Sequence, residues 1–166
     1  HMSLGVFGIV LASVILVVSP WTAIAAARLE PDAILYGLHR KQFLIVPLTD
    51  MLKFGPFVII AVLNRRRPEI HRPMMMLATL SVIAAATGRI PALTNLYAST
   101  VWNQLVGPFF PILVLGGLFL LVKTLITRRF DRWFSIGFVA LFAFCLVIWQ
   151  LAPTSAWESI ANLLTR

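Results

Sequence analysis

The sequence predicts an all-α integral membrane protein: a bundle of about five transmembrane helices followed by a short interfacial amphipathic helix at the C-terminus. Sixty percent of the residues are apolar, the mean hydropathy is +0.91, and only 12% are charged. Soluble domains carry about a quarter charged residues. A chain this apolar cannot cover its surface in water, so the bilayer must be its solvent.

Long apolar runs predict where the helices cross the membrane. Together they form a single transmembrane domain over residues 1–166, with spans at about 4–27, 43–63, 73–92, 105–126 and 133–151. Pro20 should kink the first span. Pro73 suits the first position of the third span, where its missing N–H costs nothing. Pro108 and Pro111 predict an irregular start to the fourth.

The polar stretches between and after these runs have their own signals. Residues 28–42 read as a polar connection on the membrane surface, and Pro31 after Glu30 argues against a continuous helix there. In the C-terminal tail, Ser155 and Glu158 have the spacing of a capping box. Three apolar residues fall on one face of that segment, namely Trp157, Ile160 and Leu164. We therefore expect an interfacial helix at about 155–165.

The positive charge lies in short loops. The formal net charge is +8, and seven arginines lie in two stretches: Arg65, Arg66, Arg67, Arg72, Arg128, Arg129 and Arg132. Basic residues in short loops set orientation and meet anionic headgroups. This placement argues against a nucleic-acid partner and puts loops 64–72 and 128–132 in the cytoplasm, with membrane lipids as partners.

Three ionisable residues fall inside or at the edge of the predicted spans: Asp50, Lys53 and Arg89. Charges in a membrane are costly, so they face the protein interior, pair, or serve function. The predicted orientation allows an Asp50–Arg89 ion pair, with Lys53 one turn from Asp50 on the same helix face. This intramembrane polar cluster is either a structural link between helices or a site for a proton, an anion or a headgroup.

A second cluster occupies the first basic loop and consists of Arg67, Glu69, His71 and Arg72. His71 is either a solvated loop histidine or a haem ligand. His1 is expected on the same side of the membrane, and two histidines from two helices can hold haem b. His1 is either native or the remnant of a cloning site. No catalytic residue set is found, and no other metal site is predicted.

One stretch resembles a known pattern. The string RRRPEIHRPMMMLATLSVIAAATGRIP, preceded by PLTDMLKFG, is similar to a family of uncharacterised bacterial multi-pass inner-membrane proteins with an R-R-P-E-x-H-[KR]-x-x-M loop. The residues that match are Asp50, Pro68, Glu69, His71, Arg72, Met76, Ala78, Thr79, Arg89 and Pro91. Pro73 and Met74 depart from it.

The resemblance implies a bacterial inner membrane location. It also implies that the chain is the later part of a longer protein, because relatives carry helices upstream and open this helix with H-x-x-L-G, which His1–Gly5 fits. It implies no established activity. A more distant likeness to cytochrome b561-like bundles is analogy only.

Three functional hypotheses follow. The first is a non-catalytic accessory or scaffolding subunit of a membrane complex, whose partners are other membrane-protein subunits. The second is a haem-b electron-transfer protein that uses His71 with His1 or with a histidine outside this chain. The third is a small transporter or lipid-binding protein centred on Asp50, Lys53 and Arg89.

Overall fold

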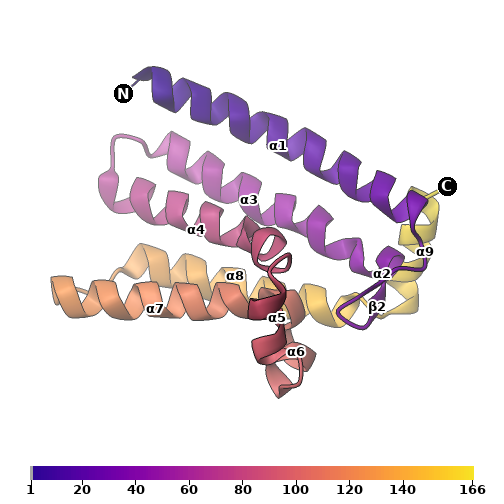
Figure 1. The fold of residues 1–166 in the computed structure, drawn as a ribbon. Helices are drawn as coiled ribbons and strands as arrows, with labels where there is room; N and C mark the ends of the chain where they lie inside the picture. The colour runs from indigo at the N-terminus through magenta and orange to yellow at the C-terminus, as the bar shows by residue number, and fades with distance from the viewer. Residues whose placement is uncertain (1) are drawn as a thin grey trace. The chain divides into compact units, whose positions relative to one another are not determined.

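The computed structural model describes residues 2–166, with side chains from residue 5 onward. It confirms the all-α class (Figure 1). Within this part of the chain, five helical segments are long and apolar enough to cross a membrane. The main helices of these segments are α1 (Met2–Leu29), α3 (Ile45–Leu63), α4 (Pro68–Thr87), α7 (Phe110–Thr127) and α8 (Arg132–Leu151).

The chain divides into two compact units. Unit 1 contains the residues up to Leu52 together with Ala152–Arg166, and unit 2 contains Lys53–Leu151. Helix α3 contributes its first half to unit 1 and its second half to unit 2. Pro56 lies inside α3 and Pro20 inside α1, each removing one backbone donor from its helix.

In unit 1, α1 ends just before Glu30-Pro31, as the sequence predicted. The polar connection then forms a small antiparallel hairpin that the sequence analysis did not predict. Its strands are β1 (Ile34–Leu35) and β2 (Leu38–His39). The turn between them consists of Tyr36 and Gly37, both at positive φ (53° and 81°). Two such residues match the right-handed twist of a two-residue hairpin.

The hairpin leads into α2 (Arg40–Phe43), which packs against the C-terminal helix α9 (Ser155–Leu164). The Trp157 Nε1–H donates to the Gln42 carbonyl at 2.9 Å, and Lys41 Nζ donates to the side chain of Asn162 at 3.1 Å. The predicted helix 155–165 is therefore present. It is docked on α2 through Trp157 and Asn162, and Ala161 of the same helix is buried.

One sequence prediction for α9 was wrong in detail. The N-cap is Thr154, whose hydroxyl accepts from the Trp157 N–H, so Ser155 begins the helix and forms no capping box with Glu158. Ile160 keeps half of its surface exposed.

In unit 2, helix α4 begins at Pro68, so the predicted start at Pro73 was wrong. Pro68 occupies the first helical position, where its missing N–H costs nothing, and Pro73 lies inside the helix, where it removes one backbone hydrogen bond. The helix ends at Thr87, short of the predicted residue 92. Pro91 instead starts a separate short helix, α5 (Pro91–Tyr97).

The fourth span has the irregular start that its prolines predicted. Helix α6 (Val101–Val106) and a 3-10 turn, η1 (Gly107–Phe109), precede α7, which begins at Phe110 rather than near residue 105. Gly107 has φ 49° and ψ −126°, and a Cβ there would run into the Trp149 ring. Only glycine can adopt this conformation and admit the indole.

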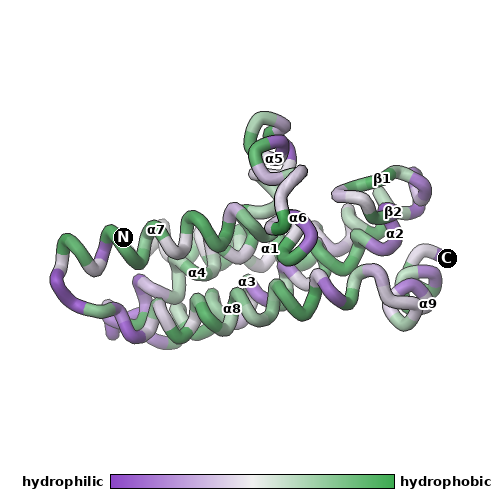
Figure 2. Tube along the Cα trace, turned by 90° about the horizontal axis from the view of Figure 1, so that it is seen from below, coloured by the Kyte–Doolittle hydropathy of each residue, from purple (hydrophilic) through white to green (hydrophobic). Residues whose placement is uncertain are grey.

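Helix α4 packs on both α7 and α8. Two glycines permit close approach: Gly137 lies against Leu77, and Gly116 lies against Phe138. Phe109, Phe134 and Leu141 are among the buried side chains. Figure 2 shows these helices as mostly hydrophobic and the turn between α7 and α8 as hydrophilic. Apolar helices joined by a polar turn are the pattern expected when the middle of each helix lies in lipid and its ends meet water.

Candidate functional site

The most unusual side chain in unit 2 is Lys53, which lies in α3 and is only 5% exposed. Its Nζ lies 4.1 Å from the centroid of the Phe109 ring in η1. The same nitrogen donates to the Sγ of Cys145 in α8 at 3.7 Å. Three elements that are far apart in sequence thus meet at one amine.

These contacts reduce the cost of burying the amine. An ammonium over an aromatic face gains about 2 kcal/mol or more when the pair is shielded from water. A thiol is a weak acceptor, so it adds less. Lys53 is therefore a buried amine in contact with a ring from η1 and a thiol from α8.

Helix α3 is continuous through Asp50 and Lys53, so the two lie one turn apart, as predicted. Asp50 is 3% exposed. Nearby Thr49 turns its hydroxyl back to the carbonyls of Ile45 and Val46, at 2.7 Å and 3.1 Å. Of the polar residues in this part of α3, Thr49 therefore finds its hydrogen-bond acceptors within the helix itself, and Asp50 and Lys53 are charged.

Arg89, the third member of the predicted polar cluster, lies in the turn after α4 and is exposed. It belongs to unit 2, whereas Asp50 belongs to unit 1. The Asp50–Arg89 ion pair therefore stays a prediction.

The two partners of Lys53 were missed from the sequence as parts of a site. Cys145 was interpreted only as a small buried hydrophobe, and its burial is confirmed. Phe109 is one of twelve phenylalanines and nothing in its local sequence distinguishes it except the prolines on either side of the Phe pair. The irregular chain that those prolines impose is what brings its ring to the lysine.

The loop cluster of Arg67, Glu69, His71 and Arg72 lies at the start of α4. Arg67 is the N-cap residue, and its carbonyl accepts from the N–H of Ile70 and of His71. Glu69 is exposed in the first turn of α4, where a negative charge is favoured by the helix dipole and by the neighbouring arginines.

His71 is half-buried and connects two helices. Its Nδ1 lies 2.8 Å from the carbonyl oxygen of Ala61 near the end of α3. A carbonyl can only accept, so Nδ1 is the donor, and in the neutral ring Nε2 is then the nitrogen with the lone pair. The Ala61 carbonyl needs this donor because the Arg65 N–H bonds Val62 instead. The sequence analysis treated this histidine as part of a loop, whereas it lies in α4 and closes a helical hairpin.

One feature of His71 is compatible with the haem hypothesis, which stays a prediction. A histidine that donates Nδ1–H to a backbone carbonyl presents Nε2 in the manner of metal-binding histidines. The proposed second ligand, His1, lies outside the described residues. Among the residues that are described, no three His, Cys, Asp or Glu side chains gather as a metal site.

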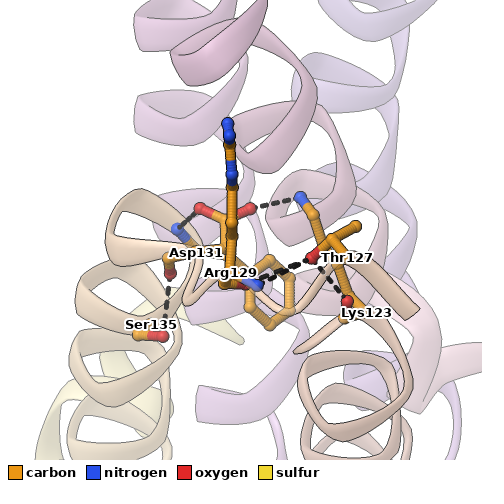
Figure 3. A network of polar contacts seen from close by, with 6 residues as sticks. Lys123, Thr127, Arg129, Asp131 and Ser135 are labelled. Atoms are coloured by element: carbon orange, nitrogen blue, oxygen red, sulfur yellow. Dashed lines mark hydrogen bonds and ion pairs between the residues drawn. The ribbon is translucent and has the colours of Figure 1, made fainter. Parts of the chain in front are cut away.

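The turn between α7 and α8 holds a further polar network (Figure 3). Asp131 forms an ion pair with Lys123, and its other carboxylate oxygen accepts from the Phe134 N–H at 3.0 Å. Thr127 accepts from the Arg129 backbone N–H at 3.4 Å. Asp131 was overlooked in the sequence, although an acidic residue just before an apolar run is a helix-start signal.

Comparison of the chain with family models, with curated proteins and with solved structures finds no match.

Proposed function

We propose that this chain is a non-catalytic subunit of a membrane complex that packs α1 against a helix of a partner protein. The observation that supports it is the surface of α1. Its apolar segment, Gly5–Leu29, is long enough to span a bilayer. Of the side chains described in this segment, only Ala27 is buried. Unit 1 thus leaves a spanning helix almost uncovered.

Lipid alone could cover such a helix, and the glycines argue for a protein instead. A Cβ at Gly5 or at Gly8 would meet nothing within 4 Å. Glycine costs a helix roughly 1 kcal/mol relative to alanine, and lipid contact does not require it. Gly8 and Ala12 have the small-xxx-small spacing that lets the backbone of another helix approach closely in a membrane, and Gly5 lies about one turn before Gly8. Ala12 extends the same face.

The test is photo-crosslinking in the membrane of the native source. A photoreactive residue replaces Ala12 on the glycine face or Val10, which lies on the opposite side of α1. We expect a protein adduct from position 12 and only lipid adducts from position 10. Introducing Gly8→Leu should abolish the protein adduct. Lipid adducts alone from both positions, or recovery of the chain as a lone monodisperse species, would contradict the proposal.

A second candidate function has one specific observation in its favour. Lys53, buried against Phe109 and Cys145, is the kind of intramembrane charge that marks a pathway or a binding site. This supports a small transporter or lipid-binding protein centred on Asp50, Lys53 and Arg89. The test compares solute flux into reconstituted vesicles for the unchanged chain and for the variants Lys53→Gln and Asp50→Asn. Flux that is the same in the variants would exclude transport at this site.

A further inference from the structure

One end of unit 2 gathers both arginine-rich turns. The turn between α3 and α4 and the turn between α7 and α8 lie at the same end in Figure 1. The packing agrees: Gly137, near the start of α8, has Met74 and Leu77 from the first half of α4 and Phe57 from the second half of α3 as neighbours. The two basic stretches in the sequence therefore form one basic end.

The charge at this end is nearly uncompensated. It carries seven guanidinium groups: those of Arg65, Arg66, Arg67, Arg72, Arg128, Arg129 and Arg132. The acidic residues of these two turns are Glu69 and Asp131, and Asp131 is already paired with Lys123. Within the described residues, none of the seven guanidiniums forms an ion pair.

The α3–α4 turn is also hollowed. Residues 62–67 line an open depression of about 670 Å³, and three consecutive arginines, Arg65–Arg67, form much of its rim. The arginine guanidinium presents a planar fork that matches two phosphate oxygens. Several guanidiniums around one hollow therefore suit a phosphate group, with its several oxygens, better than they suit an anion that is a single point charge.

Large exposed apolar side chains neighbour the arginines of both turns in the sequence. Leu63 is 78% exposed, Ile126 is 77% exposed and Phe130 is 67% exposed. A soluble anion would leave them in water. A phospholipid offers both a phosphate for the guanidiniums and acyl chains for the apolar side chains.

We propose that this basic end is a binding site for an anionic phospholipid. The phosphate of the lipid binds in the hollow formed by Arg65–Arg67, and the turn between α7 and α8 supplies additional positive charge. The acyl chains of the lipid contact the exposed apolar side chains of this end, such as Leu63. The site is independent of the partner interface proposed for α1, because it uses no residue of unit 1.

The experiment uses the purified full chain in neutral detergent, titrated with phosphatidylglycerol or with phosphatidylcholine of the same acyl chains and examined by native mass spectrometry. We expect retention of the anionic lipid only. Replacing Arg65–Arg67 by glutamine should weaken its binding by roughly fivefold per charge, on the order of a hundredfold in total.

The charge-matched control replaces Arg28, Lys41 and Arg166 by glutamine and should leave lipid binding within about twofold. Equal losses in both triple variants would show nonspecific attraction and overturn the site. Displacement of the lipid by millimolar inorganic phosphate would overturn the assignment to a lipid. If the glutamine variant unfolds, replacing Arg65–Arg67 by lysine keeps the charge and removes the forks, and unchanged binding there would contradict phosphate recognition.

Discussion

The glycines of α1 have surroundings opposite to those of three glycines of unit 2, Gly107, Gly116 and Gly137. A Cβ at Gly5 or Gly8 would meet nothing within 4 Å, whereas one at Gly137 would collide with Leu77. Both groups lie in apolar spans of similar length. Composition alone therefore does not separate a helix that is already packed from one whose close-packing face is still open. The atoms that surround the glycines of each helix make this distinction.

The largest effect is expected at Gly107, the most constrained glycine of unit 2. Gly107→Ala places a Cβ against the rigid Trp149 ring at a backbone conformation that disfavours side chains. Backbone strain and overpacking together should lower the free energy of unfolding by about 3 kcal/mol. Thermal unfolding in detergent, followed by tryptophan fluorescence, measures it.

Gly117 in α7 is the matched control for that substitution, because a Cβ there meets nothing within 4 Å. Gly117→Ala should keep or slightly raise stability, since alanine is the better helix former. Equal destabilisation by both substitutions would mean that the glycines of unit 2 are not distinguished by their packing.

A smaller effect is expected at the lysine. A double-mutant cycle between Lys53→Met and Phe109→Leu isolates the cation–π contact from the cost of each change alone. We expect a favourable coupling of about 1 kcal/mol, because the contact is desolvated. The unfolding free energies of the four proteins give the value. Coupling indistinguishable from zero would show that the ring merely fills space beside the amine.

The smallest effect on stability is expected in α1. Gly8→Leu should leave the unfolding midpoint of the isolated chain unchanged or slightly higher, because the helix gains a better former and loses no contact. The same thermal scan measures it. A clear loss of stability would mean that the isolated chain already uses this face, for instance by self-association.

The spans were predictable because stretches of about twenty residues dominated by apolar side chains have few alternatives to a membrane helix. Their ends were less predictable. Pro68 and Pro73 are both acceptable near a helix start, and local sequence does not rank them. The hairpin at Tyr36-Gly37 was hidden because its first turn residue is a tyrosine, which rarely adopts positive φ.

The candidate site was predictable only by residue type. Lys53 was identified because a charge in a span is rare. Its neighbours Phe109 and Cys145 are 56 and 92 residues away in the chain, and they are chosen by the packing of η1 and α8. His71 was noticed, but its role depends on which carbonyl α3 leaves without a donor, and this is a property of the folded turn.

The bond from His71 to Ala61 has a consequence for the basic end of unit 2. It joins the first turn of α4 to the last turn of α3 at 2.8 Å. Arg65, Arg66 and Arg67 lie in the segment between these two points. The three arginines are therefore carried on a backbone segment whose ends are already held together, so less conformational freedom is lost when an anion binds to them.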